Sequence, residues 1–160
     1  MTKIAIYPGS FDPITRGHED IVRRCFAFSD RVIVAVAINS SKTPLFTLDE
    51  RVELVREVLD GVENVRVDLF DGLLADYARR VGAHMLVRGL RAVSDFEYEF
   101  EMALMNRDLN SDLETVFLTP AVHHTFLRSS LVREVASLGG DVSRFVHPKV
   151  ESAMRRKMNL

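Results

Sequence analysis

The sequence predicts an α/β fold in which a single doubly wound, five-stranded parallel sheet carries helices on both faces. The first observation behind this prediction is the order of segments. Short apolar runs alternate along the chain with longer amphipathic stretches, and alternation of strand and helix produces a parallel sheet. The second is the run of apolar residues at 32–38, the longest in the chain. An unbroken apolar run of this length is typical of a strand that is buried on both faces.

Five segments have the length and composition of strands. The first ends at Pro8-Gly9, the fourth at Arg88-Gly89 and the fifth shortly before Pro120. The expected strands cover residues 3–7, 32–38, 65–69, 84–87 and 115–118. Glycine and proline interrupt strands, so these residues mark the carboxyl ends of the strands that precede them.

Six helices are expected between and after these strands. Two capping boxes, at residues 47–50 and 94–97, mark N-termini where a Thr or Ser and a later Glu satisfy each other's backbone amides. Gly61 and Gly82 are placed to end helices, and Pro148 is placed to open one. The expected helices cover residues 17–28, 47–59, 73–81, 94–109, 130–138 and 148–157.

Composition limits the class of protein. The chain has 160 residues, of which 47% are hydrophobic and 28% charged, so we expect one globular domain spanning residues 1–160. The net charge of −2 and the single cysteine, Cys25, argue against a nucleic-acid partner, an internal disulfide and a cysteine zinc site. The apolar runs are far shorter than the roughly 20 residues of a membrane span, and the N-terminus lacks a signal-peptide core. We therefore expect a cytoplasmic protein with no membrane association.

The turn after the first strand reads Gly9-Ser-Phe-Asp-Pro-Ile-Thr-Arg-Gly-His18. Gly9 and Gly17 let the backbone approach a ligand closely, and His18 lies at the start of a helix, where backbone amides attract anions. The Walker and dinucleotide-binding glycine patterns are both missing from this turn. The simpler interpretation is a tight strand-to-helix turn with a solvated His18.

Cationic and hydroxyl-bearing residues also follow other strands. They are Ser40-Ser-Lys42, Arg88-Gly-Leu-Arg91 and the segment 125–130. The carboxyl ends of parallel strands meet at one edge of a sheet, where such folds bind their ligands. Three cationic segments at this edge predict a polyanionic ligand.

Taken together, these motifs resemble those of the bacterial phosphopantetheine adenylyltransferases, of the nucleotidyltransferase superfamily marked by a T/HxGH motif. The matching segments are Tyr7-Pro-Gly-Ser-Phe-Asp-Pro-Ile-Thr-x-Gly-His18, Ser41-Lys42, Phe46-Thr-Leu-x-Glu-Arg51, Arg88-Gly-Leu-Arg-Ala-Val-x-Asp-Phe-Glu-Tyr-Glu99, Met105-Asn-Arg107 and Ser129-Ser-Leu-Val-x-Glu134. The resemblance implies a Rossmann-like nucleotidyltransferase fold. It also implies transfer of AMP from ATP to 4′-phosphopantetheine, giving dephospho-coenzyme A and pyrophosphate, the penultimate step of coenzyme A biosynthesis. Magnesium supplied with ATP, a homohexamer and feedback binding of coenzyme A are implied as well.

The resemblance also assigns site residues by position. The implied catalytic residues are His18, Lys42 and Arg91. Those implied to bind phosphopantetheine are Ser10, Lys42, Leu74 and Arg88. Those implied to bind ATP are Ser10, Phe11, His18, Gly89, Leu90, Arg91, Glu99, His124, Thr125, Phe126, Leu127, Arg128, Ser129 and Ser130. The chain departs from the family at Arg128, where serine is usual, and at His124, where tryptophan is frequent. No protein ligand to magnesium is expected, because no carboxylate stands out.

The implied chemistry needs no general base, because a phosphate monoester with a second pKa of about 6 is already anionic at neutral pH. Catalysis then depends on alignment and on stabilising charge at the α-phosphate. Arg88 has the planar fork that suits a phosphate. Two alternatives remain at this point: a non-catalytic nucleotide-binding sensor module, and a related mononucleotide adenylyltransferase or cytidylyltransferase.

Two further expectations concern single segments. The neighbouring His123 and His124 resemble a metal-binding pair, but adjacent side chains on a helix or strand should diverge. The helix at 94–109 carries two apolar stripes where a monomer's surface helix needs one. We therefore expect one stripe to be partly buried between subunits.

Overall fold

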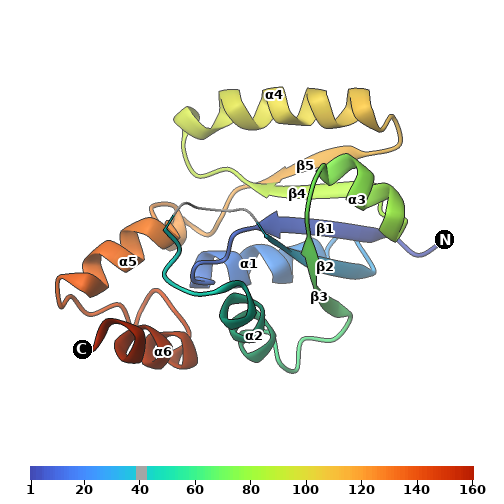
Figure 1. Cartoon of the computed structure of the whole chain (residues 1–160). Helices are drawn as coiled ribbons and strands as arrows, with labels where there is room; N and C mark the ends of the chain where they lie inside the picture. Colours follow the sequence, from blue (N-terminus) through green and yellow to red (C-terminus); the bar gives the residue numbers. More distant parts are fainter. Residues whose placement is uncertain (39–42) are drawn as a thin grey trace.

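The computed structural model describes residues 1–38 and 43–160, with only the backbone described at Ser94. Its sheet has five parallel strands in the order β3-β2-β1-β4-β5 (Figure 1). The strands are β1 Ile4–Gly9, β2 Arg31–Ala37, β3 Val65–Phe70, β4 Met85–Gly89 and β5 Glu114–Leu118. This sheet confirms the predicted α/β class and the five predicted strands.

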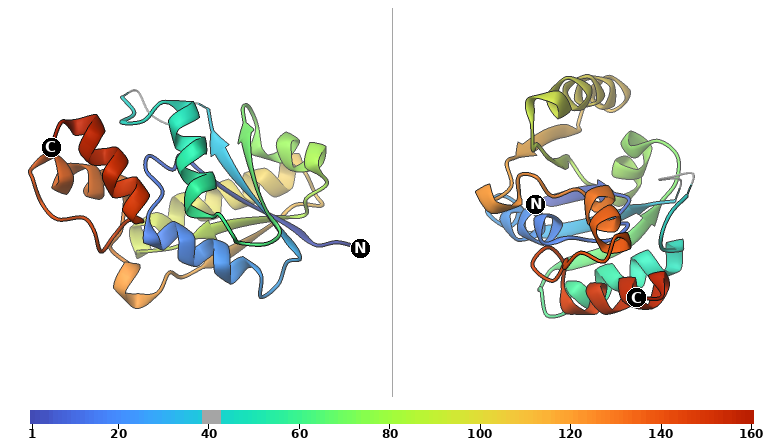
Figure 2. Two further views of the ribbon diagram at one scale, coloured as in Figure 1. Left: turned by 90° about the horizontal axis from the view of Figure 1, so that it is seen from below. Right: turned by 90° about the vertical axis from the view of Figure 1, so that its left-hand side faces the viewer.

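Helices cover both faces of the sheet, as a doubly wound fold requires. They are α1 Arg16–Cys25, α2 Leu48–Val58, α3 Leu74–Val81, α4 Val93–Leu109, α5 Ser129–Ser137 and α6 Pro148–Met158, with a short 3-10 helix, η1, at Val122–His124. Helices α1, α2, α5 and α6 share one hydrophobic cluster with the sheet, whereas α3 belongs to a second cluster on the other face. Figure 2 shows α5 and α6 side by side at one end of the molecule.

Alternation along the strands builds these two clusters. Side chains of successive strand residues point to opposite faces, so Val34 of β2 joins the α1 and α2 side while Ile33 and Ala35 join the α3 side. Val34 and Ala35 are fully buried. The prediction that the run at 32–38 is buried on both faces is therefore confirmed through Val36, although the strand itself ends at Ala37.

Several helix ends follow their sequence signals. Thr47 and Glu50 form the predicted capping box of α2, with the Thr47 amide donating to Glu50 Oε2 at 2.8 Å. Gly82 closes α3 in the left-handed region at φ 67°. His147 caps α6 by accepting from the Lys149 amide at 3.2 Å.

Other helix ends differ from expectation. Helix α1 stops at Cys25 rather than at 28, because the chain then turns to place Ser29 and Asp30 ahead of β2. The second capping box is wrong: α4 begins at Val93 with Ala92 at the N-cap and no side-chain cap. The short helix η1 was not expected at all. Within the described residues, none of the helices combines the length and the apolar character that crossing a bilayer requires.

Leu86 provides a test of the sheet packing. It is 1% exposed in β4 and belongs to the second hydrophobic cluster, so we expect Leu86→Ala to lower the free energy of unfolding by about 2–5 kcal/mol, the usual cost of a buried cavity. Leu138→Ala is the matched control, because Leu138 is 81% exposed. Urea denaturation of both variants measures the difference, and equal losses would contradict the described core.

Candidate active site

A cleft of about 680 Å³ opens at the carboxyl ends of β1 and β4. These neighbouring strands lead into α1 and α4, which lie on opposite faces of the sheet (Figure 1). The cleft therefore lies at the topological switch point, where doubly wound folds bind ligands. Predicted site residues that line it are Ser10, His18, Arg88, Gly89, Arg91, Glu99, His124, Leu127, Arg128, Ser129 and Ser130.

Other predicted site residues do not line this cleft. Phe11 is 1% exposed and packs edge-on against His18, with ring centroids 5.0 Å apart. Leu74 packs against the second hydrophobic cluster at the start of α3. Leu90, Thr125 and Phe126 are outside the lining as well. Lys42 falls outside the described residues.

His18 is fixed by a capping box at the start of α1. The Thr15 amide donates to His18 Nδ1 at 2.9 Å, and the His18 amide donates to Thr15 Oγ1 at 3.4 Å. Histidine thus occupies the position where a capping box usually has Glu or Gln. Because Nδ1 accepts this hydrogen bond, a neutral ring carries its proton on Nε2.

The surroundings of His18 keep the ring neutral. Burial, followed by the positive charges of Arg91 and Arg88, lowers the pKa of His18 to about 4. At neutral pH the ring is therefore an uncharged donor through Nε2. It is poorly suited to accept a proton, but well suited to donate a hydrogen bond to an anion.

Arg88 is held by Glu99 of α4. Its Nε and Nη2 donate to the two carboxylate oxygens at 2.8 and 2.7 Å, and its Nη1 donates to the Pro8 carbonyl at 3.2 Å. Burial alone would lower the pKa of Arg88, but the hydrogen bond and charge of Glu99 raise it. From the sequence, the planar guanidinium of Arg88 was expected to bind a phosphate. In the structure its Nε and Nη2 atoms bind the Glu99 carboxylate instead, so only the remaining Nη hydrogens can bind a ligand.

Arg91 joins two segments that are distant in sequence. Its Nη1 donates to the Leu127 carbonyl at 3.0 Å, and its Nε lies 3.4 Å from Asp95. The segment before α5 is thereby tied to the start of α4. It also packs against Gly17, where an added Cβ would lie 3.8 Å from His124 and 3.9 Å from Leu127.

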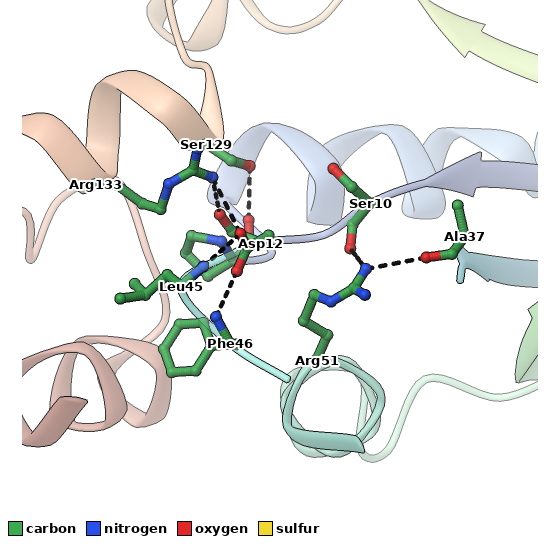
Figure 3. Close-up of polar contacts among 9 residues, drawn as sticks. Ser10, Asp12, Ala37, Leu45, Phe46, Arg51, Ser129 and Arg133 are labelled. Atoms are coloured by element: carbon green, nitrogen blue, oxygen red, sulfur yellow. Dashed lines mark hydrogen bonds and ion pairs between the residues drawn. The ribbon is translucent and has the colours of Figure 1, made fainter. Parts of the chain in front are cut away.

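A buried carboxylate that the sequence analysis missed lies in the turn after β1 (Figure 3). Asp12 is 1% exposed and accepts from the Leu45 and Phe46 amides, both at 2.9 Å. Arg133 of α5 donates through Nη1 to the backbone carbonyl of Asp12 and lies 3.4 Å from its carboxylate. Asp12 therefore joins the β1 turn, the segment before α2, and α5.

Two more contacts fasten the same turn. Ser129 Oγ donates to the Pro13 carbonyl at 2.7 Å. Arg51, which is 2% exposed, donates through Nη1 to the carbonyls of Ser10 at 2.8 Å and Ala37 at 3.1 Å (Figure 3). The carboxyl ends of β1 and β2 are thereby held together. Asp12 and Arg51 both lie in the quoted motifs, which was the available signal. The Leu45 and Phe46 amides that donate to Asp12, and the Ser10 and Ala37 carbonyls that accept from Arg51, are backbone groups that a side-chain pattern does not reveal.

The histidine pair differs from expectation. The rings of His123 and His124 lie with their centroids 4.0 Å apart, so the expected divergence is wrong. The expectation assumed a regular helix or strand, whereas these residues lie in the short turn η1. Within the described part of the chain, Nδ1 of His124 is buried without a hydrogen-bond partner. No group of three His, Cys, Asp or Glu residues gathers there to hold a metal.

Known proteins resemble this chain in sequence over almost its whole length. A family described as cytidylyltransferase-like matches residues 6–135. The phosphopantetheine adenylyltransferase of Azoarcus sp. (strain BH72) is 57% identical over 156 residues, which cover 98% of this chain and 96% of that protein. The phosphopantetheine adenylyltransferase of Ralstonia pickettii (strain 12J) is 58% identical over 154 residues, covering 96% and 92%.

Solved structures show the same fold at low identity. The nicotinic acid mononucleotide adenylyltransferase of Plasmodium falciparum superposes with a TM-score of 0.68 at 17% identity, covering 100% of this chain and 97% of its own. A bifunctional NMN adenylyltransferase/ADP ribose pyrophosphatase of Francisella tularensis gives a TM-score of 0.73 at 15% identity, covering 100% of this chain and 51% of its own. These likenesses concern the fold alone.

The state of His18 can be measured directly. Because its pKa is lowered, the folded protein keeps the ring neutral down to about pH 4. The unfolded chain binds this proton more readily than the folded protein does. The free energy of unfolding therefore has its full value above the ordinary histidine pKa of about 6.5 and falls as the pH drops from there toward 4. We expect nitrogen NMR between about pH 5 and 8 to show a protonated Nε2 and an unprotonated Nδ1 throughout. A ring that titrates near pH 6.5, or carries its proton on Nδ1, would contradict the capping geometry.

Proposed function

The chain belongs to the cytidylyltransferase-like family and, within it, to the phosphopantetheine adenylyltransferases, and from this membership we propose that it transfers the adenylyl group of ATP to 4′-phosphopantetheine. The products are dephospho-coenzyme A and pyrophosphate. The observation that carries the proposal is identity of 57% to such an enzyme over 98% of this chain. A cleft in which a neutral histidine donor and several arginines meet gives this assignment a physical basis.

The reaction balances without a general base. An oxygen of the acceptor phosphate attacks the α-phosphorus of ATP, and the bond from that phosphorus to the β-phosphate oxygen breaks. The dianionic acceptor and tetra-anionic ATP give a doubly charged dephospho-coenzyme A and tetra-anionic pyrophosphate, so no proton has to move. The protein then has to align two polyanions and stabilise charge on the oxygens around the α-phosphorus.

We assign the residues of this chain to these tasks. His18 donates from Nε2 to the α-phosphate, and Arg91 stabilises the same charge from the connection between β4 and α4. Ser10 and the unused Nη hydrogens of Arg88 bind the acceptor phosphate. Residues 124–130 bind ATP. Nδ1 of His124, which finds no hydrogen-bond partner among the described residues, is one group that a nucleotide can satisfy. Lys42 and Leu74 keep their family assignments as proposals that rest on sequence alone.

Magnesium fits this cleft as a companion of ATP. The carboxylates in the lining, Asp12, Asp95 and Glu99, each lie beside an arginine. Mg²⁺ is commonly held by substrate phosphates and waters with few protein ligands. We therefore propose that it enters as the magnesium complex of ATP, where it neutralises phosphate charge.

The proposed activity is tested by pyrophosphate release. We expect release only when ATP and 4′-phosphopantetheine are both present. Nicotinate mononucleotide in place of the acceptor, and CTP in place of ATP, serve as controls for the related transferases. Nucleotide binding without release would favour a sensor module, and release with a mononucleotide acceptor would favour the related enzyme.

Helix α4 supports a further proposal about assembly. It stands over β5 and makes few contacts with the rest of the chain (Figures 1 and 2). Its exposed apolar side chains are Val93, Phe96, Tyr98, Phe100, Met102, Leu104, Met105 and Leu109. An apolar surface of this extent is typical of an interface. We propose that this surface of α4 lies between subunits of a homohexamer.

We also propose that the enzyme is a single domain and acts in the cytoplasm. Coenzyme A resembles the product, and we propose that it binds in the active-site cleft.

His18→Ala tests the catalytic assignment. Loss of a hydrogen bond that strengthens in the transition state should lower kcat by about 10²–10³ and leave ATP binding within a few-fold. The lost half of the capping box should cost no more than about 0.5–2 kcal/mol of stability, so the variant should fold. His84→Ala is the matched control, since His84 is exposed just before β4. Steady-state kinetics decide, and a kcat within tenfold of the parent would remove His18 from the reaction.

Sedimentation tests the role of α4. We expect the parent to sediment at about six times the 18.1 kDa chain mass. Met105→Glu should dissociate the assembly, because Met105 is 57% exposed in the single chain and a carboxylate is costly to bury. Glu97→Gln, also at an exposed position on α4, is the control. A mass near 18 kDa for the parent at micromolar concentration would contradict the proposal.

A further inference from the structure

We propose that Tyr7 is a positioning residue for His18, and that its ring, together with that of Phe11, keeps water away from the imidazole and holds it in the neutral form that donates from Nε2. This proposal rests on the proposed adenylyl transfer, in which His18 is the donor to the α-phosphate. It adds to that reaction a residue that is absent from the family-derived site.

Three aromatic rings meet at the start of α1. The ring centroids of Phe11 and His18 lie 5.0 Å apart, and those of Tyr7 and His18 lie 6.2 Å apart. Tyr7 and Phe11 also pack edge-on against each other, with their centroids 5.6 Å apart. Tyr7 is 6% and Phe11 1% exposed, whereas His18 keeps part of its surface exposed and lines the cleft. The imidazole is therefore backed by two buried rings and open toward the cleft.

Tyr7 is fixed by its strand. Strand β1 lies at the centre of the sheet, between β2 and β4, and Tyr7 pairs with Val34 of β2. Its side chain belongs to the hydrophobic cluster on the α1 side of the sheet, together with Val22 and Cys25 of that helix. A ring anchored on a paired central strand gives the imidazole a rigid backing.

Phe11 supports the same imidazole from the turn after β1. Its backbone lies in the left-handed region at φ 49°, which is uncommon for a residue that has a side chain. A Cβ added at Gly9 would lie 3.1 Å from two atoms of the Phe11 ring. Glycine at this position therefore leaves room for the Phe11 ring to lie against Tyr7 and His18.

Exclusion of water has a specific consequence for His18. A protonated imidazole carries a hydrogen on Nδ1, which can no longer accept from the Thr15 amide, so protonation breaks the cap. Burial is the largest cause of the lowered pKa of His18, ahead of the charges of Arg91 and Arg88. Buried rings act in this direction because they withhold the water that would solvate the cation. Tyr7 adds no charge of its own, since burial raises the pKa of its hydroxyl.

Other ionisable groups lie around the start of α1. Glu19 accepts from Arg16 through both carboxylate oxygens, each at 3.1 Å. His124 of η1 lies beside Gly17, and burial lowers its pKa as well. The arginines that act on His18 stay charged throughout the range in which histidines titrate. Removal of the Tyr7 ring therefore changes the access of water to His18 and leaves the charges around it in place.

Nitrogen NMR of His18 in the unliganded protein tests this proposal. We expect Tyr7→Leu, which removes the ring, to raise the pKa of His18 from about 4 to at least about 5. Tyr7→Phe keeps the ring and removes only the hydroxyl, so it should leave this pKa as it is in the parent. Tyr77→Leu is the matched control, because Tyr77 is also buried but packs in the second cluster, on the other face of the sheet.

Turnover gives a second measurement. We expect the ratio of kcat/KM in Tyr7→Leu to that in the parent to fall as the pH is lowered from about 8 toward the raised pKa. Ionisation of the substrates cancels in this ratio, so the protonation of His18 remains as the cause. For Tyr7→Phe and Tyr77→Leu the same ratio should stay constant.

If Tyr7→Leu fails to fold by circular dichroism, Tyr7→Val carries the test with the same expected rise, because valine suits a strand. A pKa of His18 that is unchanged by loss of the ring, or that Tyr7→Phe or Tyr77→Leu raises equally, would overturn the proposal. The NMR titration needs no turnover. Absence of adenylyl transfer by the parent protein would therefore count against the proposed function and not against this role of Tyr7.

Discussion

The contact between Thr15 and His18 determines what the cleft can do. It begins helix α1, and it occupies Nδ1 of the ring with the Thr15 amide. The proton of a neutral ring must then lie on Nε2. Burial, with Arg91 and Arg88 nearby, keeps the ring neutral by lowering its pKa to about 4. One local contact thus produces a fixed hydrogen-bond donor at a helix N-terminus, where an anion is already favoured.

The arginines of the cleft depend on carboxylates in a comparable way. Arg88, Arg91 and Arg133 are each held by an acidic partner, and each also donates to a backbone carbonyl. Those contacts join segments that are distant in the sequence: Arg91 donates to the Leu127 carbonyl, and Arg133 donates to the Asp12 carbonyl. The pairs lower the net positive charge of the cleft, but they fix where its donors lie. A charge placed in advance stabilises a transition state without reorganisation during the reaction, which suits a reaction that needs alignment more than proton transfer.

Sequence reasoning succeeded where the signal is local and periodic. The five strands, the capping box of α2 and the position of the cleft follow from alternation, caps and the residues after each strand. It failed where a feature depends on a residue that is distant in the sequence, or where another start of the same helix competes with the expected one. The pattern at 94–97 fits a capping box, yet α4 starts earlier, at Val93, and Arg91 pairs with Asp95 across its first turn. The bond from Arg133 to Asp12 spans 121 positions and ends partly on a backbone carbonyl, so no side-chain spacing indicates it.

The central claim is that Nε2 of a neutral His18 donates to the α-phosphate while Thr15 holds Nδ1. A crystal structure of the protein with α,β-methylene-ATP, an analogue in which the bond to be broken is unreactive, tests it most directly. We expect Nε2 to lie within about 2.7–3.2 Å of an α-phosphate oxygen, with the Thr15 amide still donating to Nδ1. An α-phosphate that lies out of reach of His18, or a ring turned so that Nδ1 faces the nucleotide, would contradict it.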